Sequence, residues 1–230
     1  KEFDNIEKLI NSIFKVLNDP LIIIVDDSPD NKTGERIKKF ENIHYIYRGK
    51  KLGRGSAVID GMRHLIDKTK IDKIIEMDAD LSHDPSELNR NLSIFEKNNL
   101  DLLISSRYLK NSKIINWSIQ RRIFSLLANK LSKSILKIPI TDYTNGYRIY
   151  SKNAIQHIVI NCGKTGDGFI ILSEILVELY YKNFKIQETD SIFKNRIRGE
   201  SSVNLKLILD SFFGLLKIYK IMKKIVNKTN

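Results

Sequence analysis

Apolar residues along this chain follow two alternating patterns, one typical of helices and one of short buried strands. Residues 4–17 place apolar side chains at helical spacing, and a wholly apolar run at 21–25 follows them. The alternation continues as helix 33–40, strand 43–47, helix 57–65, strand 72–77, helix 85–97 and strand 101–105. Strands that are apolar on both faces and alternate with helices are typical of parallel sheets. We therefore predict an α/β fold, a mostly parallel sheet with helices on both faces.

Acidic residues follow two of the predicted strands at the point where each strand ends. Asp26 and Asp27 end the first strand, and Asp78 and Asp80 follow the third. Residues two apart in extended chain share a face, so the Asp78 and Asp80 carboxylates can bind one cation, of which Mg²⁺ and Mn²⁺ suit oxygen ligands best. Because parallel strands open at the same edge of a sheet, both acidic pairs are predicted to converge on one ligand. A lone Asp-x-Asp is also typical of a polar turn, and the second pair favours the metal site.

A helix is predicted to begin shortly after the second acidic pair. Asp84 can cap it, Pro85 fits its first position, and Glu87 would complete a capping box. His83, one residue earlier, has two interpretations: it faces a ligand, or it bonds to a nearby backbone group.

A glycine-rich turn separates the second predicted strand from the helix that follows it. Gly53 and Gly55 lie in this turn, and Lys51 precedes them. Backbone amides and a nearby cation can approach a phosphate at such a turn. A plain tight turn is the alternative interpretation.

Two basic stretches predict amphipathic helices. Residues 115–137 have two open interpretations, a structural helix or a helix whose arginines contact a substrate. Its apolar stripe is made of Ile119, Ile123, Leu126, Leu127, Leu131 and Ile135. Residues 205–226 are typical of a helix at a membrane interface, with core packing as the alternative. The apolar face of this second helix lies opposite Lys206, Lys217, Lys220, Lys223 and Lys224. No linker occurs before about residue 200, so we expect a catalytic domain at 1–204 and a helix and tail at 205–230.

Composition limits the classes of protein that fit. The 230 residues are 42% hydrophobic and 29% charged, which is typical of a soluble globular chain, and no run of 18 apolar residues suggests a membrane span. The single cysteine, Cys162, excludes an internal disulfide and a cysteine-based zinc site and fits a reducing compartment. The net charge of +12 predicts an anionic partner. Nucleic acid is not expected, because no basic motif interleaved with aromatic residues occurs.

The ordered motifs of this chain resemble those of a known enzyme family. They are Val25-Asp26-Asp27-Ser28-Pro29-Asp30, Lys51-Leu52-Gly53-Arg54-Gly55, Met77-Asp78-Ala79-Asp80-Leu81-Ser82-His83-Asp84-Pro85, Ser105-Ser106-Arg107-Tyr108, Trp117, Arg121-Arg122, Asp142-Tyr143-Thr144-Asn145-Gly146-Tyr147-Arg148 and Arg196-Ile197-Arg198-Gly199-Glu200-Ser201. Over about residues 1 to 205, the chain resembles dolichol-phosphate (polyprenol-phosphate) mannosyltransferases. These are inverting family 2 glycosyltransferases with the GT-A fold.

The resemblance implies a reaction and its partners. A hexose, expected to be mannose from GDP-mannose, would pass to a polyprenyl or dolichyl phosphate with the help of Mg²⁺ or Mn²⁺. UDP-glucose or another nucleotide sugar remains an alternative donor. The enzyme would lie peripherally on the cytoplasmic face of a membrane, held by the membrane surface or by a membrane-anchored partner.

The resemblance also implies roles for single residues. Asp26 and Asp27 would contact the base and ribose of the donor, Asp78 and Asp80 would hold the metal ion, and Arg107 with Arg121 or Arg122 would receive the acceptor phosphate. Arg196 would close over the donor diphosphate, and Lys51, Gly53 and Arg148 complete the expected substrate contacts. Asp80 and Arg107 would be the catalytic residues. The acceptor phosphate is already anionic, with a second pKa near ~6, so no strong general base is required.

The chain departs from the family pattern at three places. Family members begin with an apolar strand followed by Pro-Thr-Tyr-Asn-Glu, whereas this sequence begins at Lys1 about where that motif ends. We therefore expect the first, central strand to be missing from this sheet, or its place to be filled by another segment. Ser82 stands where a Gln beside the metal is common, and Ser202 stands where the closing loop often has a Lys.

A phospho-receiver domain is the main alternative of another class. The stretch from Ile24 to Pro29 is similar to the start of such a domain, which requires a later Lys at a strand end. The matching strand end, 105–108, offers Arg107 instead. A sugar-nucleotide pyrophosphorylase would need a Gly-rich N-terminal signature that this sequence lacks. Both alternatives are therefore disfavoured.

Overall fold

The computed structural model describes the backbone of residues 3–66, 71–163, 170–195 and 205–229. The helices are α1 (Phe3–Phe14), α2 (Lys32–Ile37), α3 (Arg54–Ile66), the 3₁₀ turn η1 (Pro85–Glu87), α4 (Leu88–Lys97), α5 (Ile119–Leu136), α6 (Lys152–Asn161), α7 (Ile170–Tyr181) and α8 (Leu205–Thr229). The strands are β1 (Ile22–Asp26), β2 (Ile43–Tyr47), β3 (Lys73–Glu76), β4 (Leu102–Ser106), β5 (Lys113–Ile115), β6 (Arg148–Ser151), β7 (Ile186–Asp190) and β8 (Ile192–Lys194).

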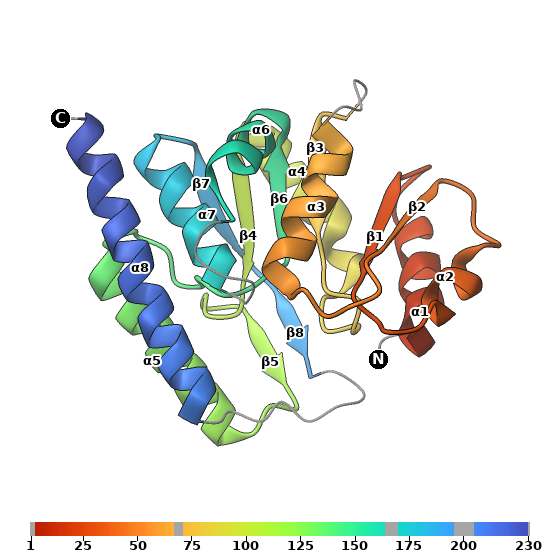
Figure 1. The fold of residues 1–230 in the computed structure, drawn as a ribbon, viewed down its shortest axis with the longest axis horizontal. Coiled ribbons are helices and arrows are strands. Elements are labelled where there is room, and N and C mark those ends of the chain that lie inside the picture. Colours follow the sequence, from red (N-terminus) through yellow and green to blue (C-terminus); the bar gives the residue numbers. More distant parts are fainter. Residues whose placement is uncertain (1–2, 67–70, 164–169, 196–204, 230) are drawn as a thin grey trace.

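The alternating pattern of the sequence produces a layered α/β fold (Figure 1). Four strands form the main sheet in the order β3-β6-β4-β7, and β1 with β2 forms a separate parallel pair. The pair β5–β8 is a third, short parallel sheet. The prediction of an α/β fold is therefore confirmed.

The pairing around β6 differs from the mostly parallel sheet that the sequence pattern suggested. β6 runs antiparallel to both β3 and β4, whereas β4 and β7 are parallel. The reason is the path of the chain after α5. The segment 137–147 brings the chain back to the end of β4, where the Ser105 amide donates to the carbonyl of Tyr147, so β6 starts where β4 ends. The main sheet is consequently mixed.

Strand β4 shows how the core is divided between the two faces of the main sheet. Leu102 and Ile104 join the large cluster formed with α6, α7 and α8, whereas Leu103 joins Phe95 of α4 in a second cluster on the other face. This alternation follows from the two-residue period of a strand. These three side chains of β4 are fully buried. The main sheet is therefore covered by helices on both faces, as predicted.

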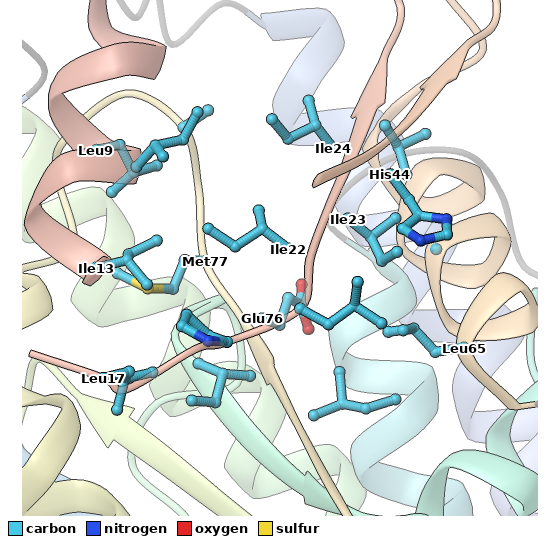
Figure 2. Close-up of a pocket in the computed structure, with 18 of the residues that line it drawn as sticks. Leu9, Ile13, Leu17, Ile22, Ile23, Ile24, His44, Leu65, Glu76 and Met77 are labelled. Atoms are coloured by element: carbon cyan, nitrogen blue, oxygen red, sulfur yellow. The ribbon is translucent and has the colours of Figure 1, made fainter. Parts of the chain in front are cut away.

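A groove of about 1060 Å³ separates β1 from β3. Figure 2 shows Leu9 and Ile13 of α1 lining it together with Ile22 and Ile24 of β1. Within the described strands, β1 pairs only with β2, and β3 pairs only with β6. Among the described strands, β1 and β3 are therefore in separate sheets.

Helix α8 packs in the core with the apolar face that the sequence assigned to a membrane interface. Leu215, Ile218, Met222 and Ile225 are buried in the large cluster, where α8 contacts α7. The side chains of residues 205–212 and 228–230 lie outside the described part of the structure. The alternative interpretation, a core-packing helix, therefore describes this face, and α8 shares its core with residues assigned to the catalytic domain.

The apolar stripe of α5 is exposed, in contrast to the buried face of α8. A structural helix would bury this stripe, but Ile119, Ile123, Leu126, Leu127 and Leu131 are exposed. The buried face of α5 is instead formed by Asn129, Ser132 and Leu136. Both helices are amphipathic, and periodicity alone does not reveal which apolar face finds a partner.

Candidate active site

The segment that follows β3 carries the predicted metal ligands. The Asp80 carboxylate accepts a hydrogen bond from the amide of Ser82 at 3.0 Å, and Leu81 between them adopts a left-handed backbone with φ of 63°. Asp78 lies two residues earlier and its carboxylate is partly exposed. Both acids are therefore held on one tight turn at the carboxyl end of β3.

Arg54 connects this turn to the glycine-rich segment. Its Nε donates to Asp78 Oδ1 at 3.0 Å, and its Nη2 donates to Glu76 Oε1 at 2.7 Å. Burial of the Asp78 carboxyl opposes its ionisation, but the charge of Arg54 and its hydrogen bond outweigh that effect and hold the pKa of Asp78 below its usual range. Asp78 is therefore anionic near neutral pH.

His83 binds a nearby backbone group, which is one of the two interpretations that the sequence left open. Its Nδ1 accepts a hydrogen bond from the amide of Asp78 at 3.0 Å, and its Nε2 lies 3.0 Å from Oδ1 of Asn145. Because Nδ1 is the acceptor, Nε2 carries the proton and donates to Asn145. The buried ring also stacks on Tyr147. His83 therefore positions the Asp78 backbone.

The second acidic pair holds the neighbouring loops in place. Oδ2 of Asp27 accepts from the amides of Leu52 and Gly53 at 3.1 and 2.9 Å, and its Oδ1 accepts from Nε of Arg48 at 2.6 Å. Gly53 is followed by Arg54, which binds Asp78. The two acidic pairs are therefore linked through two successive residues, which agrees with the predicted convergence at one edge.

The carboxyl group of Asp26, at the end of β1, has a lowered pKa, which favours its ionised form. Burial of its carboxyl raises the pKa, but hydrogen bonds from Ser28 and Tyr45 outweigh this and leave the pKa below its usual range. The amide of Ser28 donates to Oδ1 at 2.8 Å, and the hydroxyl of Tyr45 donates to Oδ2 at 2.8 Å.

The loop 142–146 is the hub of the site. Asp142 is fully buried and accepts from Nε and Nη2 of Arg107, both at 2.7 Å. Asn145 binds His83, and Gly146 lies against the guanidinium of Arg54. One loop thus fixes Arg107, the turn that carries Asp78, and Arg54.

A cluster of cations and aromatic rings lies beside this hub. The guanidinium of Arg121 lies 4.0 Å from the ring centre of Trp117, and that of Arg107 lies 5.4 Å from it. Phe193 packs edge-on against Trp117. Nε1 of Trp117 is buried and has no hydrogen-bond partner among the described residues. Nη1 of Arg107 likewise makes no hydrogen bond within the described part of the chain. Together these groups present donors and positive charge to an anion.

The other predicted substrate contacts are placed differently. Arg148 is fully buried and donates to the carbonyls of Tyr143, Asn145 and Leu172, so its position supports a structural role. Arg122 is exposed and donates to the carbonyl of Ile114 at 2.8 Å. Two further predicted contacts are Lys51, which is exposed, and Gly53, whose amide is directed to Asp27 and not to a phosphate site. Arg196 lies outside the described residues.

The predicted helix start needs one correction. Asp84 caps as expected, because its Oδ1 accepts from the amide of Ser86 at 3.0 Å. Glu87 does not complete a capping box. Its carboxylate accepts from the hydroxyl of Ser191 at 2.7 Å and the amide of Ile192 at 2.8 Å. These two hydrogen bonds fix the β7–β8 connection and replace the single local bond of a capping box. Their donors are distant from Glu87 in the sequence, so a local pattern does not reveal them.

Comparison with known proteins assigns the chain to a family. Residues 1–159 match the family described as glycosyl transferase family 2. The chain belongs to glycosyl transferase family 2. It is 34% identical over 230 residues to a dolichol-phosphate mannosyltransferase of Pyrococcus furiosus, covering 96% of this chain and 61% of that protein. It is 27% identical over 217 residues to a polyprenol monophosphomannose synthase of Mycolicibacterium smegmatis, covering 92% of this chain and 81% of that protein. The chain thus spans about three fifths of the length of the first relative.

Solved structures support the same fold for this family 2 chain. A crystal structure of glucosyl-3-phosphoglycerate synthase from Mycobacterium tuberculosis, in complex with Mn²⁺, UDP and glucosyl-3-phosphoglycerate, has a TM-score of 0.69 and 16% sequence identity. The match covers 95% of this chain and 76% of that one. The same enzyme in complex with phosphoglyceric acid has a TM-score of 0.68. The fold of this chain is therefore of the GT-A type.

The donor set of this family 2 chain fits a hard divalent cation. Asp78 and Asp80 supply carboxylate oxygens from one turn, and the buried hydroxyl of Ser82 has no hydrogen-bond partner among the described residues. Oxygen ligands of this kind, completed by water and phosphate oxygens, suit Mg²⁺ or Mn²⁺. Within the described residues, no group of three or more His, Cys, Asp or Glu side chains is placed to hold a metal ion by itself. A metal at this turn would therefore depend on ligands from the substrate.

Sequence reasoning missed the residues that connect the site. Arg54, Asp142 and Asn145 were quoted within motifs but received no role. Arg54 and Asn145 each stand next to a glycine, which is a weak signal, and no local signal marks Asp142. Only the folded chain brings these partners together.

Gly146 provides a test of the link between Arg54 and Asp78. A Cβ atom at Gly146 would lie 1.8 Å from Nη2 of Arg54, so Gly146→Ala must displace a guanidinium anchored by Glu76 and Asp78. We expect this change to lower the free energy of unfolding by about 1–3 kcal/mol, the usual cost of overpacking. It should also weaken Mn²⁺-dependent binding of a nucleoside diphosphate in calorimetry.

Gly61→Ala in α3 is the matched control for this prediction. A Cβ there meets only Val25 Cγ2, at 3.4 Å, and alanine is favoured over glycine in a helix by about 1 kcal/mol. The control is expected to keep both stability and nucleotide binding. Equal behaviour of the two variants would contradict the role given to Arg54.

Proposed function

We propose that this chain transfers a hexose from a nucleotide sugar to a polyprenyl phosphate, with mannose from GDP-mannose as the first candidate. The observation that carries the proposal is the juxtaposition of the cation cluster with the acidic turn. Arg107 lies near enough to Asp78 that each shifts the pKa of the other, upward for Arg107 and downward for Asp78. A phosphate acceptor and a metal-bound diphosphate donor require these two environments side by side. The names of the two relatives support the same substrates.

The donor is assigned to the edge formed by β1, β3 and the glycine-rich segment. Asp26 and Asp27 would serve the base and ribose, Asp27 through the loop 52–53 that its carboxylate holds. Asp78 and Asp80 would hold Mg²⁺ or Mn²⁺ on the diphosphate, and the ion would stabilise negative charge on the leaving nucleoside diphosphate. A turn that carries two acidic side chains needs such a cation before a diphosphate can approach it.

The acceptor is assigned to Arg107 and Arg121. An oxygen of the acceptor phosphate would form a bond to the anomeric carbon of the sugar, on the face opposite the bond that breaks. The bonding electrons would leave with the nucleoside diphosphate. Arg107 and Arg121 would hold the acceptor phosphate by charge-assisted hydrogen bonds, with the Trp117 N–H as a further donor. The acceptor is already anionic, so no general base is assigned.

The proposed acceptor determines where this protein would act in the cell. Polyprenyl phosphates reside in membranes, and no helix within the described residues has the length and apolarity to cross one. We propose peripheral attachment at the cytoplasmic face, where nucleotide sugars are available. UDP-glucose remains the second candidate donor, because the GT-A fold accommodates several nucleotides. The family match leaves no support for a phospho-receiver domain.

A nucleotide-binding screen tests the donor assignment. GDP, UDP, GDP-mannose and UDP-glucose are titrated into the protein by calorimetry, with and without Mn²⁺. We expect GDP compounds to bind more tightly than UDP compounds, and only when metal is present. Preference for UDP would move the assignment to the second donor, and metal-independent binding would contradict the role of Asp78 and Asp80.

Arg121 offers a test of the acceptor site that leaves the hub intact. Arg121→Ala should raise the KM for polyprenyl phosphate by about 10-fold or more, since a hydrogen bond to a charged group contributes about 1.5–3 kcal/mol. The Kd for GDP should stay unchanged. Arg122→Ala is the control, because Arg122 is exposed and bonded to a backbone carbonyl. A larger effect of Arg122→Ala, or loss of GDP binding in Arg121→Ala, would contradict the assignment.

A further inference from the structure

Two of the four histidines of this chain lie side by side, outside the hydrogen-bond network of the candidate active site. Nδ1 of His44 on β2 lies 3.1 Å from Nε2 of His64 on α3, and the two ring centres are 5.2 Å apart with their planes tilted by 59°. Figure 2 shows His44 near Ile23, its register partner on β1. A strand and a helix thus each contribute one imidazole to the pair.

The other contacts of the two rings leave them available to a ligand. Within the described residues, neither ring forms a further hydrogen bond or ion pair. His64 is exposed and His44 is half-buried, so solvent reaches the pair. His83, in contrast, is buried and bonded through both ring nitrogens. The rings of His44 and His64 can therefore turn toward a common ligand without breaking contacts to the rest of the described chain.

The spacing of the two nitrogens fits coordination of one metal ion. Imidazole nitrogens bind Zn²⁺ at about 2.0–2.1 Å, so two of them on one ion lie about 2.8–3.4 Å apart for ligand angles between about 90° and 109°. The observed 3.1 Å falls within this range. As a hydrogen-bonded pair, one nitrogen donates its proton to the other. When a metal binds, that proton would pass to the second nitrogen of its own ring, so both imidazoles stay neutral and each offers a lone pair.

The type of ligand selects the type of metal. Imidazole suits Zn²⁺, Ni²⁺ and Cu²⁺, whereas carboxylate and water suit Mg²⁺ and Mn²⁺. Asp60 lies one helical turn before His64, but Nη1 of Arg48 donates to its Oδ2 at 3.0 Å, and Nη1 of Arg63 lies 3.5 Å from its Oδ1. Among the described residues, no third His, Cys, Asp or Glu is placed to join the pair. Water would therefore complete the coordination shell.

We propose that His44 and His64 form a binding site for a late transition-metal ion such as Zn²⁺, which joins β2 to α3. The site differs in its ligand chemistry from the acidic turn that follows β3. Helix α3 begins at Arg54, whose guanidinium binds that turn, and β2 pairs with β1, which ends at Asp26. A metal bridge between β2 and α3 would therefore stabilise the edge to which the donor is assigned, without contacting the substrate.

Calorimetry with ZnCl₂ tests the site on untagged, nucleotide-free protein. His44→Gln and His64→Gln should each lower the affinity for Zn²⁺ by about tenfold or more, because changes behind a metal ligand alone typically cost about 10–100-fold. At a hundredfold excess over its Kd, Zn²⁺ should raise the Tm of the unchanged protein by about 5–10 °C. Neither variant should show this rise.

Electron paramagnetic resonance with Cu²⁺ identifies the ligands directly. One equivalent of Cu²⁺ should give a spectrum with couplings from two imidazole nitrogens in the unchanged protein, and from at most one in either variant. An excess of Mg²⁺ should leave this spectrum unchanged, because Mg²⁺ requires oxygen ligands. A Cu²⁺ spectrum of the unchanged protein without two coupled nitrogens would overturn the proposal.

His157→Gln is the matched control. His157 lies on α6, is half-buried, and has its Nε2 2.9 Å from Oε1 of Glu178, so the same chemical change is made away from the pair. The control should bind Zn²⁺ and Cu²⁺ like the unchanged protein. Equal Zn²⁺ affinity in His64→Gln and His157→Gln, with circular dichroism confirming that both are folded, would overturn the proposal. Loss of Zn²⁺ binding in Asp78→Asn but not in His64→Gln would overturn it in favour of the acidic turn.

Discussion

Asp78→Asn and Asp80→Asn are each expected to lower metal-dependent hexose transfer by about 10²–10³-fold, the usual effect of removing one group that stabilises developing charge. Asparagine keeps the size of the side chain and an oxygen that can accept the Ser82 amide, but it removes the charge that holds a divalent cation. Because both acids act through one ion, the double variant should be little worse than either single variant. Initial rates at saturating Mn²⁺ measure the effect.

Asp72→Asn is the control for this pair. Asp72 is exposed and precedes the start of β3, at the end of the strand away from the acidic turn. Its replacement should leave the rate unchanged. Full activity in Asp78→Asn or Asp80→Asn, with metal still required, would show that the cation is held elsewhere.

Breaking the Arg107–Asp142 pair is expected to be the most destabilising single change in the site. Arg107→Met leaves the fully buried Asp142 carboxylate without its counter-charge, which costs about 3–5 kcal/mol for a buried pair. For a chain of this size, each kcal/mol shifts the Tm by about 2–4 °C. Thermal unfolding should therefore show a fall of about 10 °C. A fall within 2 °C would contradict the structural role of the pair.

The same pair predicts a pH dependence with a definite sign. Burial of Asp142 raises its pKa, but the Arg107 guanidinium and its hydrogen bonds outweigh this, so the pKa of Asp142 is lowered in the folded chain. Its stabilisation is therefore present above the unfolded pKa of about 3.9 and is lost as the pH falls through the lower folded value. Urea unfolding of the unchanged protein and Asp142→Asn should show a stability difference that narrows below about pH 4.

Local signals in the sequence predicted much of the fold. The strands β1, β2, β3 and β4 each lie within one or two residues of a predicted strand, because short apolar runs mark them in the sequence. The acids at the ends of β1 and β3 were found for the same reason. Only β4 is buried throughout, whereas β1 and β3 are partly exposed. No strand was predicted after residue 105, so the four strands β5 to β8 were all missed. For β5 and β8 the reason is that three residues of alternating exposure carry no periodicity.

The remaining features depend on contacts that sequence patterns do not encode. The antiparallel direction of β6 follows from the path of residues 137–147, and the roles of Arg54 and Asp142 follow from partners 24 and 35 residues away. The same is true of the apolar faces of the two amphipathic helices, because that of α5 is exposed and that of α8 is buried. Each helix has an apolar stripe, and only the position of α7 decides that α8 is the one that packs in the core.

Transfer to lipid is the most direct measurement of the central claim. The protein is incubated with Mn²⁺, polyprenyl phosphate and either labelled GDP-mannose or labelled UDP-glucose, and organic extraction recovers any lipid-linked sugar. The account predicts labelled, acid-labile lipid from GDP-mannose that disappears when Mn²⁺ or polyprenyl phosphate is omitted. Folded protein that binds nucleotide but yields no lipid-linked sugar from either donor would contradict it.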